Sequence, residues 1–199
     1  EFQVNEHVLI PRQDTETLVE LVLSEHKEKN ISLLDVCTGS GCIAISLAKL
    51  GGYTDVTALD LSEEALKVAR SNGEKLLDQP VKFIKSDMFS ALNPEKQYNV
   101  IVSNPPYIPS QVIEGLEPEV KDHEPRMALD GEPDGLKFYR ILAEEGKKYL
   151  KNGGSIYMEI GWDQAKDVTE IFEAMGFSGL RTVRDMAGND RVVCARKEK

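Results

Sequence analysis

Short apolar runs alternate along the chain with longer amphipathic segments. Most of the runs begin or end beside an Asn, Asp, Gly or Pro, which is typical of buried strands flanked by turns. Five such runs lie at residues 31–36, 56–59, 81–84, 98–102 and 155–160. Two more strand-like runs, 180–184 and 191–195, end the chain. The pattern therefore predicts seven strands.

The segments between the runs carry apolar residues at helical spacing. Asp14 is a candidate N-cap for a first helix that extends toward His26, and Ser62 for a helix that extends toward Leu77. Further helices are predicted at 43–50, 136–150 and 164–175, with Asn152-Gly153-Gly154 as a stop signal. Strands that alternate with helices indicate an α/β fold: a doubly wound, mostly parallel sheet with helices on both faces. No helical segment joins the last two runs, so an antiparallel strand is expected there.

The segment from Ile108 to Asp134 shows neither pattern. It is rich in Pro and acidic residues, and an irregular loop of this length inside a compact domain is usually functional or disordered. Because it directly follows Asn104-Pro105-Pro106-Tyr107, we interpret it as a lid that faces the substrate. A solvated, mobile insertion is the alternative.

Composition limits the classes of partner. The 199 residues suffice for one domain with a sizeable core, and the formal net charge of −10 disfavours general binding to nucleic-acid phosphates. No apolar run is long enough to cross a membrane, and no signal peptide is visible. The odd cysteine count (Cys37, Cys42 and Cys194) indicates a reducing compartment, hence the cytoplasm, and their spacing predicts small buried residues with no metal site.

Three successive strand ends carry groups suited to a nucleoside. The first strand runs into Gly39-Ser40-Gly41, where glycines let the backbone approach a ligand and a helix begins. Asp60 ends the second strand and can bind ribose hydroxyls. Asp87 follows the third strand and can accept a hydrogen bond from an adenine amino group, with Met88 and Phe89 packed on the base. The alternatives, a helix cap for Asp60 and a turn acid for Asp87, do not explain why all three coincide.

The fourth strand delivers Asn104-Pro105-Pro106-Tyr107. Proline restricts its own torsion and that of the preceding residue, so Asn104 is held extended at the carboxyl edge of the sheet, where open α/β sheets bind ligands. Its carboxamide oxygen can accept from a planar NH2 group, and the Tyr107 ring can pack on that group. The stretch suits an enzyme that modifies an amide or amine nitrogen. A structural turn with a capping Asn is the alternative.

Taken together, these residues resemble a class I S-adenosylmethionine-dependent methyltransferase. Asp35 to Gly41 resembles the first motif of that class, with Cys37 where a glycine is commoner. Asn104 to Tyr107 resembles the Asn/Asp-Pro-Pro-Tyr/Phe motif of amino-group methyltransferases. That motif is shared by DNA adenine, ribosomal RNA guanine and protein glutamine enzymes.

Other segments resemble one branch, the HemK/PrmC-type peptide chain release factor glutamine methyltransferases. The similar stretches cover nearly the whole chain: Val8–Glu16, Ser103–Ile108, His123–Leu129, Asp134-Gly135-Leu136 with Tyr139-Arg140, Glu159-Ile160-Gly161 and Asp190–Val193. The family that methylates a glutamine of a ribosomal protein shares much of this pattern. The Asp134-Gly135-Leu136 and Tyr139-Arg140 features favour the release-factor branch.

The resemblance implies a Rossmann-like fold, S-adenosylmethionine as cofactor and S-adenosylhomocysteine as product. It implies that Asn104, Pro105 and Tyr107 are catalytic, that Pro106 joins them in substrate contact, and that the substrate is the glutamine of the Gly-Gly-Gln motif in class 1 release factors. The implied cofactor residues are Asp35, Cys37, Thr38, Gly39, Ser40, Gly41, Asp60, Leu61, Asp87, Met88, Phe89 and Asn104.

The family comparison also sets the expected organisation. Residues 1–30 are expected to form a lead-in segment and first helix, and 31–199 the methyltransferase domain. The family's amino-terminal helical domain, which grips the release factor, is expected to be absent, and the start at Glu1 rather than Met indicates a fragment. A monomer is favoured, and neither a membrane nor a nucleic-acid partner is expected.

Some assignments stay open. Arg12 and Glu16 either close over the cofactor or substrate, or form a surface salt bridge. Glu159 either contributes to the site or orders the neighbouring loop, and no His is assigned a catalytic role. A nucleic-acid amino methyltransferase, a nucleoside-binding module without chemistry and a nicotinamide oxidoreductase are the rival functions.

Overall fold

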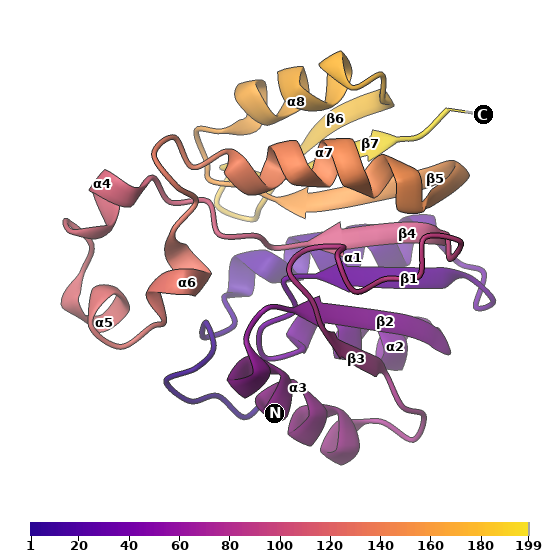
Figure 1. Cartoon of the computed structure of the whole chain (residues 1–199), viewed down its shortest axis with the longest axis horizontal. Coiled ribbons are helices and arrows are strands. Elements are labelled where there is room, and N and C mark those ends of the chain that lie inside the picture. Colours follow the sequence, from indigo (N-terminus) through magenta and orange to yellow (C-terminus); the bar gives the residue numbers. More distant parts are fainter. Residues whose placement is uncertain (199) are drawn as a thin grey trace.

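Seven strands form one sheet in the order β3-β2-β1-β4-β5-β7-β6 in the computed structural model, which describes residues 1–198 (Figure 1). Strand β7 is antiparallel to both of its neighbours, β5 and β6, and the other adjacent pairs are parallel. The predicted mostly parallel seven-stranded sheet with an antiparallel carboxyl-terminal strand is therefore confirmed. The strands are β1 Ser32–Val36, β2 Asp55–Asp60, β3 Lys82–Lys85, β4 Tyr98–Ser103, β5 Leu150–Glu159, β6 Ser178–Arg184 and β7 Asp190–Arg196.

Helices cover both faces of the sheet because the central strands are apolar on both sides. Helices α1 (Glu16–Glu25), α2 (Cys42–Gly51) and α3 (Glu63–Leu76) lie on one face, and α7 (Lys137–Tyr149) and α8 (Ala165–Ala174) on the other (Figure 1). In β1, Leu33 packs in the core with α1 and α2, whereas Leu34 packs in the core with α7 and α8. The central strands are thus a buried layer, and the loops at their carboxyl ends are where a site can lie.

The helix signals were partly right. Ser62 caps α3 as predicted, since its Oγ accepts from the Ala65 N–H at 3.2 Å. The cap assigned to Asp14 is wrong: it lies in a short 3-10 turn, Gln13–Thr15, and no side-chain hydrogen bond caps α1. Asp14 instead pairs with Arg191, at 3.3 Å.

The start of β5 also differs from the prediction. The stop signal Asn152-Gly153-Gly154 lies inside β5, which begins directly after α7 at Leu150. The register between β4 and β5 shifts between Tyr98 and Val100. The glycines therefore lie in an irregular part of β5, a bulge, and do not end the helix.

The segment between residues 108 and 134 is not irregular. It contains three helices of four residues each, α4 (Ser110–Ile113), α5 (Pro118–Lys121) and α6 (Arg126–Leu129). They project beyond the carboxyl ends of the strands (Figure 1). In residues 1–198, no helix combines the length and apolar character needed to cross a membrane.

Candidate active site

A tight turn connects β1 to α2 at the carboxyl edge of the sheet. The Gly39 N–H donates to Asp60 Oδ2 at 2.8 Å, and the Thr38 N–H donates to the Leu59 carbonyl at 2.8 Å, so the turn is fastened to the end of β2. Gly41 has a φ of +80°, and a Cβ there would meet Ile45 Cδ1 at 2.9 Å. This position accepts only glycine without strain, because side chains rarely adopt that conformation and the space is filled.

Cys37 also lies in the left-handed region, with a φ of +63°. A non-glycine residue in this conformation costs on the order of 1 kcal/mol. The half-buried thiol lines the cavity described below and lies 3.9 Å from the Met88 sulfur. The departure from glycine at this position is therefore accommodated at a modest cost.

Asp35 lies behind this turn and is fully buried. Its Oδ2 accepts from Thr38 Oγ1 at 2.6 Å and from the Ala44 N–H at 3.2 Å, while Oδ1 has no partner among the described residues. Burial raises the pKa of Asp35 to about 7, against the opposing effect of these two hydrogen bonds. The carboxyl therefore orders the glycine turn from beneath.

A cavity of about 1050 Å³, including its open mouth, lies over the ends of β1, β2 and β3. Ten of the predicted residues line it: Cys37, Thr38, Gly39, Ser40, Asp60, Leu61, Asp87, Met88, Asn104 and Pro106. Asp60 accepts the Gly39 and Ser62 N–H groups, and burial raises its pKa.

Two covers meet over the cavity. One is the lead-in segment before α1, which contributes residues 7–9, 11, 12 and 15, and the other is the 108–134 segment, through Pro125, Met127 and Ala128. The covers are joined by an ion pair in which Arg12 Nη2 donates to Glu124 Oε1 at 2.6 Å. Arg12 is therefore part of the enclosure, which favours the first of the two interpretations of this residue.

A second hollow, of about 450 Å³ including its mouth, adjoins the first cavity. Pro105, Tyr107 and Glu159 line it from the sheet edge, and Val120, Glu124 and Leu129 from the 108–134 segment. Four residues line both spaces: Leu9, Arg12, Asn104 and Ala128. Asn104 therefore lies at the boundary between a large cavity and a smaller hollow.

Comparisons with known proteins identify the family. The family model described as the methyltransferase small domain matches residues 13–115. A release factor glutamine methyltransferase from Thermodesulfovibrio yellowstonii is 43% identical over 201 residues, which cover 100% of this chain and 72% of the relative. The chain belongs to the release factor glutamine methyltransferase family. The relative from Fusobacterium nucleatum is 44% identical over 98% of this chain, and the chain spans 56% of that relative's length.

Solved structures agree with this assignment to the family. The release-factor-specific protein-(glutamine-N5) methyltransferase from Alicyclobacillus acidocaldarius is 31% identical, with a TM-score of 0.57 over the full length of both chains. A methyltransferase from Pyrococcus furiosus has a TM-score of 0.73 at 20% identity and covers 100% of this chain and 89% of its own. At that identity the likeness shows only the shared methyltransferase fold.

Three of the residues expected at the cofactor lie away from the cavity wall. Phe89 is 1% exposed and stacks on Tyr149 in the core, with ring centroids 5.2 Å apart. The backbone of Met88 has a φ of +46°, so the chain turns there and Met88, not Phe89, lines the cavity. Asp35 lies beneath the glycine turn and Gly41 ends it, so both shape the turn without lining the cavity.

Sequence reasoning missed the buried amide of Gln164, which holds the turn after Asn104. Its Nε2 donates to the Tyr107 carbonyl at 2.9 Å and to the Gly135 carbonyl at 3.3 Å, and its Oε1 accepts from the Gly161 N–H at 3.0 Å. A Cβ on Gly135 would lie 2.4 Å from the Tyr107 oxygen, and one on Gly131 would lie 2.8 Å from the Tyr107 Cα. Close backbone packing therefore fixes the turn.

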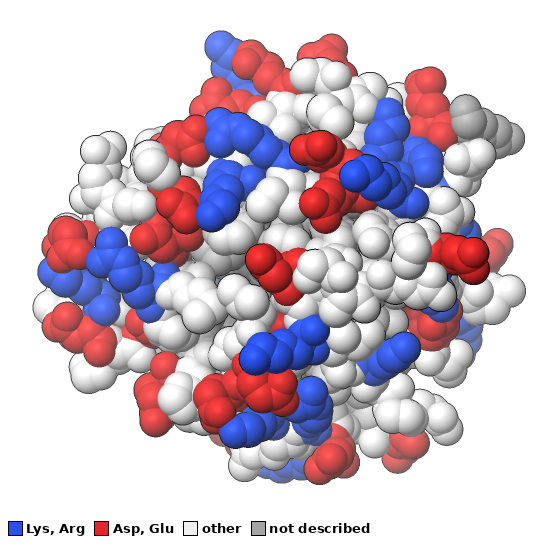
Figure 2. All heavy atoms as spheres, viewed as in Figure 1, with Lys and Arg blue, Asp and Glu red and all other residues white. Residues whose placement is uncertain are grey.

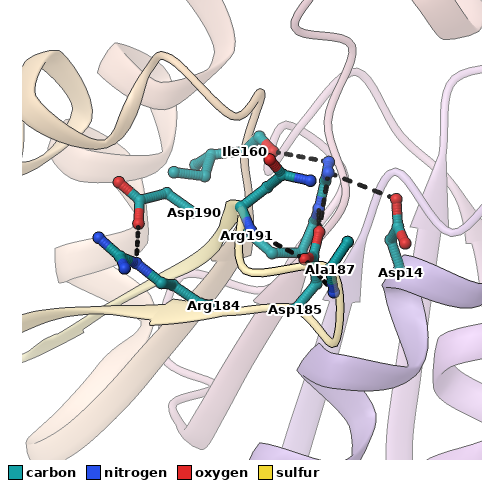
Figure 3. A network of polar contacts seen from close by, with 8 residues as sticks. Asp14, Ile160, Arg184, Asp185, Ala187, Asp190 and Arg191 are labelled. Atoms are coloured by element: carbon teal, nitrogen blue, oxygen red, sulfur yellow. Dashed lines mark hydrogen bonds and ion pairs between the residues drawn. The ribbon is translucent and has the colours of Figure 1, made fainter.

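Glu159 lies at the end of β5 with 2% of its surface exposed, and its Oε2 has no partner among the described residues. Burial raises the pKa of Glu159, against hydrogen bonds from Thr15 and Asn104 and the charge of Arg191. Arg191 itself is buried and binds Asp185 at 3.1 Å and the Ile160 carbonyl at 3.3 Å (Figure 3). The carboxyl-terminal hairpin thus braces the sheet edge behind Asn104.

Proposed function

We propose that this chain transfers a methyl group from S-adenosylmethionine to the side-chain amide nitrogen of a release factor glutamine, in the Gly-Gly-Gln motif. The observation that carries the proposal is the position of Asn104, which lines both the large cavity and the second hollow. A residue at that boundary can hold a substrate nitrogen beside a cofactor. Membership of the release factor glutamine methyltransferase family supports the same assignment.

The residues around the large cavity fit S-adenosylmethionine. The glycine turn permits close approach of the ligand to the backbone. Each Asp60 oxygen accepts one N–H and keeps a lone pair for a ribose hydroxyl, while Asp87 and Met88 are available to an adenine base. When bound, this cofactor supplies a methyl group on a positively charged sulfur, and S-adenosylhomocysteine is the product.

In the second hollow the chain's own groups would bind the substrate amide. Asn104 Oδ1 and the Pro105 carbonyl would each accept one N–H of the NH2 group, which orients the nitrogen lone pair toward the large cavity. Tyr107 lines the same hollow and would pack on the amide plane and exclude water. Positioning of this kind can lower the activation barrier substantially even when no strong base takes part.

Electrostatic stabilisation of the transition state would lower the activation barrier further. An amide nitrogen is a poor nucleophile because its lone pair is delocalised, and it becomes more positive as it is methylated. The two acceptors, Asn104 Oδ1 and the Pro105 carbonyl, then bind its N–H groups more strongly than in the ground state, which lowers the barrier. The methylated amide is acidic and loses its extra proton without a dedicated base.

Other features support a cytoplasmic location and a protein substrate. The three cysteines are free, which suits the cytoplasm, where release factors act. Acidic and basic side chains are interspersed on the face drawn in Figure 2, with no continuous basic area among the described residues there. This favours a protein substrate over a nucleic acid. We propose a monomer, with residues 1–30 acting as a lead-in to the catalytic domain.

Asn104→Ala tests the proposal. We expect a loss of turnover of at least about a hundredfold on a purified release factor, comparable to removal of one transition-state hydrogen-bonding group. Affinity for S-adenosylhomocysteine, measured by calorimetry, should remain within about threefold. Asn152→Ala, at an exposed position in the amino-terminal part of β5, is the matched control and should behave as wild type. Near-normal methylation by Asn104→Ala would refute the assigned role.

A further inference from the structure

The second hollow contains two buried carboxyl groups that lack a full set of partners. Glu124 and Glu159 both line it, and the Oε2 atom of each has no hydrogen-bond partner among residues 1–198. A buried acceptor without a partner is unfavourable, and more so for a charged group. Two such oxygens on one small hollow indicate that it is built to receive hydrogen-bond donors.

The two carboxyl groups come from different parts of the chain. Glu159 belongs to the sheet edge, where Asn104 and Thr15 contact it, so its place is behind the carboxamide that would hold the substrate nitrogen. Glu124 belongs to the 108–134 segment and faces the hollow beside Val120 and Leu129. A peptide whose glutamine reaches Asn104 would therefore enter the hollow that Glu124 also lines.

The environment of Glu124 indicates which donor it would accept. Its side chain is 2% exposed, and Arg12 already binds its Oε1 at 2.6 Å. That cation balances the charge, so a second cationic side chain is not required, whereas a neutral N–H suffices for Oε2. The terminal torsion of Glu is broad, so a small rotation presents the free oxygen to the hollow at little cost.

We propose that Glu124 is a substrate-binding residue whose free oxygen accepts a main-chain N–H of the peptide that carries the methylated glutamine. The inference rests on the proposed function and names a contact within that site. Consecutive residues are about 3.8 Å apart, and Asn104 and Glu124 line the same hollow, so the candidate donor is an N–H close to the glutamine. Glycines beside the glutamine leave the main chain open to such a contact.

The ion pair gives this contact a second role. Arg12 comes from the lead-in segment and Glu124 from the 108–134 segment, so their pairing holds the two covers together where the two spaces meet. A peptide bound to Glu124 would thus contact the junction of the covers. Both covers are then in place when substrate is bound.

Glu124→Gln isolates the contact. The variant keeps an oxygen for Arg12 but turns the free acceptor into an NH2 donor, which opposes a substrate N–H. We expect the KM for a release factor to rise about tenfold, with kcat changed less than threefold and S-adenosylhomocysteine affinity unchanged. Glu114→Gln, an exposed position in the same segment that pairs with Lys121 and Arg126, is the matched control and should leave the KM unchanged.

Ester-substituted peptides identify the donor. In synthetic Gly-Gly-Gln peptides, the main-chain N–H of the glutamine and of each flanking residue is replaced by oxygen, one position at a time. With wild type, one replacement should lower kcat/KM about tenfold, and Glu124→Gln should no longer distinguish that ester from the amide. If Glu124→Gln lowered kcat/KM equally for the amide and for every ester, Glu124 would only hold the two covers together, and the inference would be overturned.

The outcomes separate the two proposals. An unchanged KM for Glu124→Gln on a release factor that wild type methylates overturns the Glu124 contact and leaves the proposed function standing. Failure of wild type to methylate any release factor overturns the proposed function, and the inference with it.

Discussion

Replacement of Gln164 by Ala tests how the turn after Asn104 is held. The 7% exposed side chain makes three hydrogen bonds to backbone groups, those of Tyr107, Gly135 and Gly161, at 2.9, 3.3 and 3.0 Å. Leaving one buried polar group without its partner costs about 1–3 kcal/mol. Because the 3.3 Å contact is the weakest and water can enter the space, we expect the free energy of unfolding to fall by about 2–4 kcal/mol.

Urea unfolding followed by circular dichroism measures this loss. For a chain of this size, about 3 kcal/mol corresponds to a fall in Tm of about 6–12 °C. Gln97→Ala is the control, because its exposed side chain makes one hydrogen bond, of 3.3 Å, to the Lys148 carbonyl. That variant should change the free energy of unfolding by less than about 0.5 kcal/mol.

Activity under conditions where the variant is fully folded distinguishes a positioning role from general stability. Gln164 does not contact Asn104 directly but binds the Tyr107 carbonyl three residues away, so we expect kcat to fall about tenfold while S-adenosylhomocysteine affinity is kept. Gln164→Glu keeps an acceptor for the Gly161 N–H but places a carboxylate oxygen against the Tyr107 and Gly135 carbonyl oxygens. It should therefore lower stability and kcat at least as much as Gln164→Ala. An ordinary surface substitution changes the free energy of unfolding by up to about 0.5 kcal/mol. If Gln164→Ala stayed within that range and kept a normal kcat, the role assigned to Gln164 would be refuted.

Two further predictions concern the cavity wall. Burial raises the pKa of Asp35 to about 7, so the folded protein keeps a proton that the unfolded chain releases above about pH 4. Stability should therefore fall between about pH 4 and pH 7, by on the order of 4 kcal/mol from this group, and Asp35→Asn should flatten that slope in urea titrations; an unchanged slope would contradict the assignment. Burial raises the pKa of Cys42 to about 11 and that of Cys37 well above its usual value, so both thiols should be alkylated slowly, and more slowly still with S-adenosylhomocysteine bound. Both thiols line the large cavity, so peptide mapping that found no protection of either would argue against this cavity as the cofactor site.

The strands and the polar groups at their carboxyl ends were predictable because their signals are local. An apolar run that ends at Asp60 or Asn104 indicates within a few residues both a buried strand and the polar group at its carboxyl end. The parallel order then brings those ends to one edge, which is a property of the fold class and not of any long-range contact. Ser62 is of the same kind, since a cap acts within one helical turn.

The features that sequence reasoning missed depend on contacts between distant segments. Gln164 binds the Tyr107 carbonyl across 57 positions, and Arg12 binds Glu124 across 112, so neither has a local pattern. Phe89 was placed beside the base because an aromatic next to Asp87 suits adenine, but the positive φ of Met88 turns the ring into the core. The chain between 108 and 134 lacks a helical pattern because four-residue helices are too short to show one.

The most direct test of the central claim is the mass of the Gly-Gly-Gln peptide from a class 1 release factor after incubation with the protein and S-adenosylmethionine. We predict one added methyl group, located by fragmentation on the glutamine side chain, and no addition with Asn104→Ala. An unmodified glutamine, together with methyl transfer to a ribosomal protein or to DNA offered in the same reaction, would contradict the proposed substrate.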